Sequence, residues 1–102
     1  MKNNPETRSE EWTGFSEIVH NHIVSYTIDQ YGDKGTDLTS SMSKADILKQ
    51  IEKYVMRNTL GKNKRGHLEE LRDCLKIAHY ACMLFYKHDL SDEEIESLMK
   101  GK

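Results

Sequence analysis

The stretch HLEELRDCLKIAHYACMLFYK, residues 67–87, decides the fold class of this 102-residue chain. Its apolar side chains recur every three or four residues, which is the spacing of one face of an α-helix. A second apolar face lies beside the first. A helix that is apolar on two sides lies between neighbouring elements, so the stretch predicts the central helix of an all-α domain. The first face consists of Leu68, Leu71, Leu75, Ala78, Cys82 and Phe85, and the second of Ile77, Ala81 and Leu84.

The preceding segment predicts a second helix, which ends at Gly61. Ser43 is a good N-cap, and Asp46 stands three residues later, the spacing of a capping box. An apolar stripe follows at helical spacing. The stripe consists of Ile47, Leu48, Ile51, Tyr54 and Val55.

The last helix has the best start signal in the chain. Ser91 and Glu94 match a capping box, and Leu90 and Ile95 have the spacing of a hydrophobic staple. Acidic residues in the first turn suit the helix dipole. We expect the helix to dock on the rest of the domain through Ile95, Leu98 and Met99.

Residues 12–31 predict the first helix, although β-branched residues and an alternating pattern at 23–28 leave a strand as the competing interpretation. Gly32 ends the segment. Residues 1–11 are polar and predict a disordered tail. The chain is therefore expected to form one all-α domain over residues 12–102, a small four-helix, bundle-like arrangement. The helical stripe of the first segment consists of Phe15, Ile18, Val19, His22, Ile23 and Tyr26.

Composition and cysteine spacing limit the compartment and the partners. Charged residues make up 31% and the net charge is −2, which argues against nucleic acid as a partner. The apolar stretch 74–86 is too short to span a bilayer, and no signal peptide is visible, so no membrane is expected. Cys74 and Cys82 are two helical turns apart, which is too far for a disulfide. Buried free thiols would suit a reducing compartment, so the chain is predicted to be cytoplasmic.

Polar residues inside the central helix form the main candidate site. Glu70 and Asp73 are three residues apart and share a face, so their carboxylates could supply oxygen ligands for Mg²⁺. Lys76 and His79 continue the row and could contact a phosphate and a base or sugar, respectively. The alternative is structural: an ion pair between Asp73 and Lys76 beside a solvated helix start.

Two loops carry further candidates. The turn from Tyr31 to Lys34 could present backbone amides and a lysine to a phosphate, although it lacks P-loop spacing. A plain helix-terminating turn is the alternative. Lys62, Lys64 and Arg65 form a basic cluster that could touch phosphates or simply be a solvated loop.

Several of these pieces together resemble a known family. The order is Tyr31-Gly32, then an Ile-rich helix with basic residues over 47–57, then the run DCLKIAHYA at 73–81. It resembles the nucleotide modification-associated domain, type 1, a small helical family of phages and bacteria. The resemblance covers roughly residues 31–86 and implies a role in nucleotide metabolism.

The acids also look like those of MazG-type nucleoside triphosphate pyrophosphatases, in which E-x-x-E on one helix and E-x-x-D on a later one hold Mg²⁺. Glu70 and Asp73 match the second motif. At the place of the first, this chain has Glu17 and His20 instead of two acids. The resemblance therefore implies half of such a metal site and argues against a standard pyrophosphatase.

The leading hypothesis is an accessory protein of nucleotide metabolism that binds a nucleotide or phosphorylated ligand, with Mg²⁺ as the one cofactor considered. Binding rather than catalysis is favoured; if the chain is an enzyme, a metal-dependent nucleotide hydrolase is expected. The alternative is a non-enzymatic interaction module or homodimer. It would use an apolar face that includes the methionines Met42, Met56, Met83 and Met99.

Overall fold

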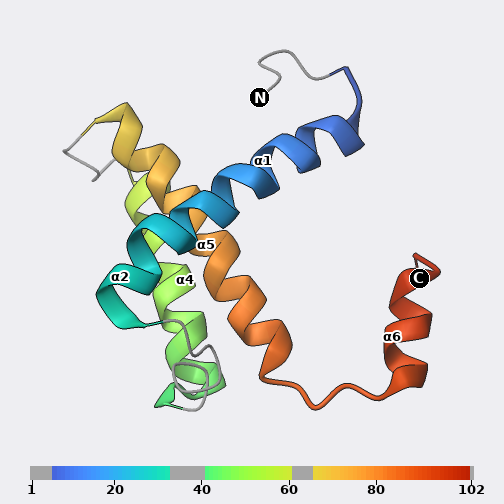
Figure 1. The fold of residues 1–102 in the computed structure, drawn as a ribbon. Coiled ribbons are helices and arrows are strands. Elements are labelled where there is room, and N and C mark those ends of the chain that lie inside the picture. The colour runs from blue at the N-terminus through green and yellow to red at the C-terminus, as the bar shows by residue number, and fades with distance from the viewer. Residues whose placement is uncertain (1–5, 33–40, 61–65, 102) are drawn as a thin grey trace.

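The computed structural model describes residues 6–32, 41–60 and 66–101. Over these residues the fold is all-α, with no strand, as the sequence predicts (Figure 1). Within the described ranges, four helical segments follow one another, and the first passes from α-helix to π-helix and back to α-helix without a break. The elements are α1 (Arg8–His22), the π-helix η1 (Ile23–Thr27), α2 (Ile28–Tyr31), α4 (Lys44–Thr59), α5 (His67–Tyr86) and α6 (Asp92–Met99).

The antiparallel pair α4 and α5 holds the buried centre, and α1 crosses α5 (Figure 1). Among the described residues, the buried apolar side chains are Ile47 and Tyr54 of α4 and Met83 of α5. Thr27 and Asp73 are buried beside them. The prediction that residues 67–87 form the central helix therefore agrees with the contacts of α5.

The first helix begins four residues before the predicted start. The hydroxyl of Thr7 accepts a hydrogen bond from the backbone N–H of Glu10 (3.1 Å), and α1 runs from Arg8. This N-cap is a local signal for a helix that begins before Trp12. Residues 8–11 are thus helical rather than part of the predicted tail, whose first five residues lie outside the described part of the chain.

The competing strand at 23–28 is not formed. The backbone N–H of Ile28 bonds to the carbonyl of Ile23, five residues back, which is the hydrogen bond of a π-helix. Crowding of the β-branched side chains of this segment against the preceding turn is consistent with this wider winding. The β-branched residues that made a strand the competing prediction therefore lie in a π-helical turn of a continuous helical segment.

Both predicted capping boxes are present. The hydroxyls of Ser43 and Ser91 accept hydrogen bonds from the backbone N–H groups of Asp46 (3.1 Å) and Glu94 (3.2 Å), and both carboxylates bond back to the N-cap N–H. Each box satisfies two backbone donors that no helical partner can reach. α4 and α6 therefore begin where the sequence predicts.

The predicted docking of α6 is wrong. This helix lies apart from the others, beyond the end of α5 (Figure 1). Ile95, Leu98 and Met99 remain 45%, 51% and 82% exposed. The five residues between α5 and α6 hold the last helix away from the pair, so its apolar stripe covers no other helix among the described residues.

The prediction of buried thiols is also wrong, because Cys74 and Cys82 are both exposed and free. Both lie on positions of α5 that no other described element covers. Since neither thiol is buried, the argument from buried thiols to a reducing compartment does not apply. In the described part of the chain, no helix combines the length and apolar character needed to cross a membrane.

Candidate ligand-binding site

A cavity of about 330 Å³ lies where η1, α4 and α5 meet. Such a volume is at the lower end of the range of small-molecule sites. Half of the described lining residues carry a phenol ring or an imidazole, and none of them is acidic. The cavity is lined by His22, Tyr26, Thr27, Met42, Gln50, Tyr54, Lys76, His79, Tyr80 and Met83.

The π-helix decides which side chains of the first segment reach the cavity. The rings of His22 and Tyr26, one turn apart, stack with centroids 5.3 Å apart at an angle of 20°. Thr27, at the end of η1, is buried. Because a π-helix turns more widely than an α-helix, it rotates the positions after His22 relative to those before it. Tyr26 keeps 47% of its surface exposed, so its ring is accessible to a ligand.

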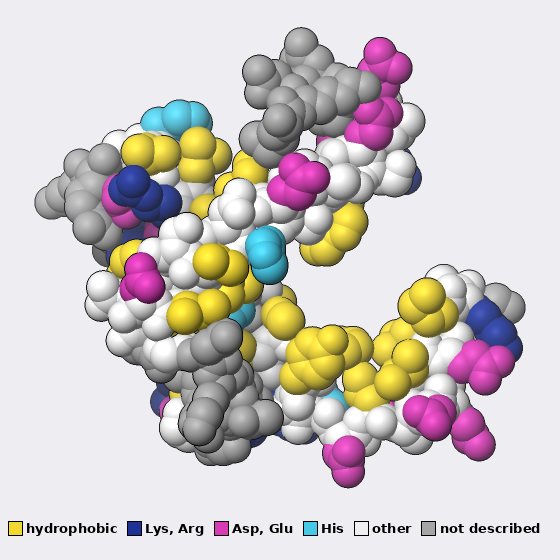
Figure 2. All heavy atoms as spheres, in the orientation of Figure 1, with side chains coloured by type: hydrophobic (Ala, Val, Ile, Leu, Met, Phe, Trp, Pro, Cys, Tyr) yellow, Lys and Arg dark blue, Asp and Glu magenta, His cyan; other side chains and the backbone are white. Residues whose placement is uncertain are grey.

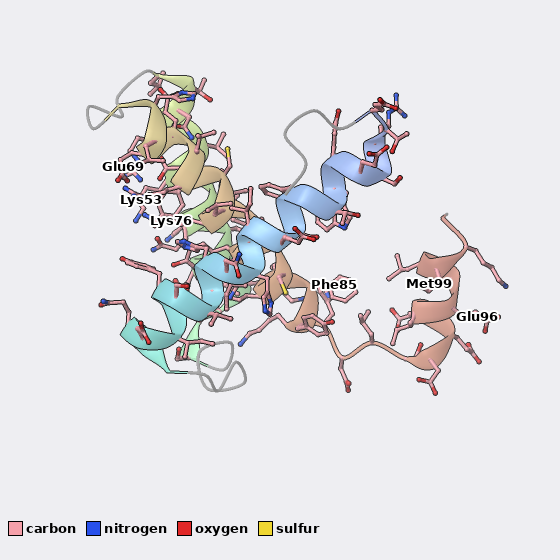
Figure 3. The ribbon with its side chains drawn as sticks, turned by 45° about the horizontal axis from the view of Figure 1, so that its top comes forward. Lys53, Glu69, Lys76, Phe85, Glu96 and Met99 are labelled. Carbon is pink, nitrogen blue, oxygen red and sulfur yellow. The ribbon has the colours of Figure 1, made fainter. Side chains whose placement is uncertain are left out.

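Positive charge gathers around Tyr54. The ammonium groups of Lys53 and Lys76 lie 4.7 and 5.3 Å from the centre of its ring, and the guanidinium of Arg57 lies 5.0 Å away. Figure 3 shows Lys53 and Lys76 on the same side of the α4–α5 pair. The ring also stacks on Tyr80, with centroids 6.2 Å apart. Tyr54 is only 8% exposed, so it orients the cations rather than offering a free face.

Two imidazoles face this positive environment. Burial lowers the pKa of His22 below its ordinary 6.5, and the charges of Lys76 and Arg72 lower it further. Burial also lowers the pKa of His79, with a smaller contribution from His22. Both rings are therefore neutral at pH 7 and can donate or accept hydrogen bonds, while Lys76 supplies the full positive charge.

Asp73 has a different role from the one predicted. Its carboxylate is fully buried and accepts two hydrogen bonds from Arg57, at Nε (3.1 Å) and Nη2 (2.5 Å). This paired geometry is the strongest form of an arginine–carboxylate interaction. The structural alternative, an ion pair, is thus the better description, but the partner is Arg57 of α4 rather than Lys76 on the same helix.

The structure brings some of the predicted site residues together and separates others. Lys76 and His79 both line the cavity. Glu70 is exposed on α5, and Asp73 is paired with Arg57. Tyr31 is the last residue of α2, with no described side chain, and Lys34 lies outside the described residues. The same holds for the basic cluster, Lys62, Lys64 and Arg65.

Glu70 and Asp73 do not fit a Mg²⁺ site in this arrangement. Both oxygens of Asp73 are bonded to Arg57, so a cation would have to displace a guanidinium from a buried carboxylate. Within the described residues, no group of three acidic, histidine or cysteine side chains is placed to hold a metal. Mg²⁺ binding stays a prediction that a direct titration can test.

Other lining residues were not singled out by sequence reasoning as ligand contacts. Tyr26 and Tyr54 were assigned to apolar helix stripes, and Tyr80 was left unassigned. His22 was placed on the same stripe of the first helix as Tyr26. One signal was available: His22 and Tyr26 are four apart, a spacing that stacks two rings on a helix. The convergence of η1 with α4 and α5 could not be derived from spacing along the chain.

Comparison with known proteins adds no relative. No protein-family model, curated protein or solved structure matches the chain. The resemblances to nucleotide-associated helical families therefore stay predictions.

Proposed function

We propose that the chain binds a small phosphorylated ligand of the nucleotide class in the cavity between η1, α4 and α5. The observation that carries the proposal is a lysine, Lys76, placed beside aromatic rings and neutral imidazoles in a cavity whose described lining has no carboxylate. An anion is the ligand that such a lining favours, since no described lining acid would repel it.

Each part of the ligand has a matching part of the cavity. Lys76 binds a phosphate oxygen through a charge-assisted hydrogen bond. The accessible ring of Tyr26 offers a face on which a base stacks, as aromatic side chains do in many nucleotide sites. Gln50 presents both a donor and an acceptor to polar groups of a base or sugar. The volume favours one nucleoside phosphate over a dinucleotide.

The proposal concerns binding and includes no reaction. Neither a nucleophile paired with a base nor a set of metal ligands is found among the described lining residues. We therefore propose a binding or carrier role in nucleotide metabolism, with metal-dependent hydrolysis as an activity to be tested separately.

Titration of ¹⁵N-labelled protein with AMP, adenosine, ribose 5-phosphate and inorganic phosphate tests the proposal. Shifts should centre on Tyr26, Lys76 and His79. Replacing Lys76 by Met should weaken AMP binding by about 10- to 100-fold, the value of one charged hydrogen bond. Lys49→Met changes an exposed lysine of α4 outside the described lining and should leave binding unchanged.

Tyr26→Leu separates the two halves of the ligand. It should weaken AMP binding by about 5- to 100-fold through lost stacking but leave inorganic phosphate binding nearly unchanged. Absence of shifts at the cavity with every compound, or equal loss in the two lysine variants, would contradict the proposal.

A further inference from the structure

The chain exposes a continuous group of apolar side chains at its C-terminal end. Figure 2 shows hydrophobic side chains on the end of α5 and on α6, both facing the hollow between these helices. In Figure 3, Phe85 and Met99 point toward one another across this hollow. We call this group the C-terminal apolar surface. It consists of Phe85 (42% exposed), Tyr86 (70%), Ile95 (45%), Leu98 (51%) and Met99 (82%).

The protomer exposes more surface than a compact folded chain of the same mass. Its accessible surface is 8083 Å², whereas a folded monomer of 11.9 kDa exposes about 5,900 Å². The excess, about 2,100 Å², belongs to the whole chain, and the roughly 800 Å² that each partner buries in an ordinary stable interface is less than half of it. The radius of gyration, 15.3 Å, likewise exceeds the roughly 13 Å of a compact chain of this length.

We propose that the C-terminal apolar surface binds a second copy of the chain, with α6 of each copy packed on the end of α5 of the other. Each chain carries one exposed apolar helix, α6, and one exposed apolar helix end, that of α5. In a pair of chains, each α6 can therefore cover the α5 end of the other chain. Such reciprocal exchange closes with two-fold symmetry and leaves neither element uncovered. The inference is independent of the ligand proposed for the cavity, because no residue of this surface lines that cavity.

The stripe of α6 has the form that such packing needs. Ile95, Leu98 and Met99 follow the i, i+3, i+4 spacing of one helix face. The opposite face carries Glu93 and Ser97, which remain in solvent when the stripe is covered. The two capping hydrogen bonds at Ser91 stabilise the start of α6 within its own chain. The helix is therefore already formed when a second copy binds it.

Sedimentation equilibrium of the full chain over micromolar concentrations tests the proposal. We expect a mass about twice 11.9 kDa. Leu98→Asp places a charge in the interface and should raise the dissociation constant by about 30-fold or more. Ser97→Asp adds the same charge to the outer face of the same helix and should leave the constant within a few-fold. Circular dichroism confirms that both variants keep their helices.

A second measurement uses the unaltered chain. In a mixture of ¹³C-methionine-labelled and unlabelled copies, isotope-filtered NOE spectra should connect the Met99 methyl of one copy to aromatic protons of Phe85 or Tyr86 of the other. A monomer mass at every concentration overturns the proposal. So does a dimer that the two aspartate variants weaken equally, or one without these inter-copy NOEs.

Discussion

The α4–α5 pair and α6 begin in the same way and end in different environments. α4 and α6 each start with a complete serine–acid capping box and carry an apolar stripe. In α4 the stripe leads to Ile47, which is fully buried against the rest of the domain. In α6 every residue remains exposed. Local signals therefore specify where both helices form, but they do not specify whether a helix is packed.

The α4–α5 pair and α6 also differ in their polar contacts. The buried ion pair between Arg57 and Asp73 joins α4 to α5, and the cavity opens beside the same helices. The ion pair of α6, between Glu96 and Lys100, is exposed and stays within one helical turn. An exposed pair of this kind contributes little to stability. The candidate ligand site thus lies on the packed part of the chain.

The largest expected effect is on the packed helices. Ile47→Ala removes a fully buried side chain and should lower the free energy of unfolding by about 3 kcal/mol. Lys49→Ala changes an exposed residue two positions along the same helix and should alter it by less than about 0.5 kcal/mol. Urea denaturation measures both. Equal small effects would show that α4 is no better packed than α6.

Asp73→Asn should have the second largest effect. It removes the charge that pairs with Arg57, whose side chain is 28% exposed, so we expect a loss of about 2 kcal/mol rather than the full value of a buried pair. Glu70→Gln alters the neighbouring exposed acid and should change stability by less than about 0.5 kcal/mol. If instead both variants keep stability and abolish Mg²⁺ binding, the metal prediction replaces the ion-pair account.

Substitution of the two capping serines, Ser43 of α4 and Ser91 of α6, compares the two regions directly. Ser43→Ala should lower the free energy of global unfolding by about 1 kcal/mol, because α4 is part of the cooperative core. Ser91→Ala weakens α6 by a similar amount. In the dilute, dissociated chain it should leave the global value unchanged and only reduce helix content. Chemical denaturation and circular dichroism of the two variants separate these effects, and an equal loss of global stability would show that α6 packs in the protomer.

The smallest effect is a pH dependence from the cavity. The folded-state pKa values of His22 and His79 are lowered, so the unfolded chain binds more protons than the folded chain below about pH 6.5. Stability should therefore fall as the pH decreases from about 6.5 through the folded-state pKa values. Unfolding at several pH values checks this, with the double variant His22→Asn, His79→Asn expected to weaken the trend. An unchanged trend in that variant would assign it to other groups.

The sequence predicted features that depend on near neighbours. The starts of α4, α5 and α6, both capping boxes and the all-α class follow from residues within four positions of each other. The start of α1 was missed although Thr7 supplies an equally local signal. Contacts across helices were not predictable in this way: Asp73 is sixteen residues from Arg57, and spacing on one helix favoured Lys76 as its partner.

The candidate site was predictable only where its residues lie on one helix. Lys76 and His79 stood out because polar residues are costly in an apolar helix, and both line the cavity. His22 and Tyr26 meet Lys76 and His79 only because the first helical segment lies across the α4–α5 pair. That arrangement depends on the packing of side chains that are far apart in the sequence. The spacing of apolar residues along one helix cannot predict such contacts.

Native-state hydrogen exchange at several protein concentrations tests the central contrast most directly. At low concentration, amides of α4 and α5 should be protected by the full free energy of unfolding, while those of α6 exchange with little protection. Protection of α6 should then rise with concentration as a second copy covers its stripe. If α6 is as protected as α4 and α5 at the lowest concentration, and does not change with concentration, the helix packs within its own chain and the contrast is wrong.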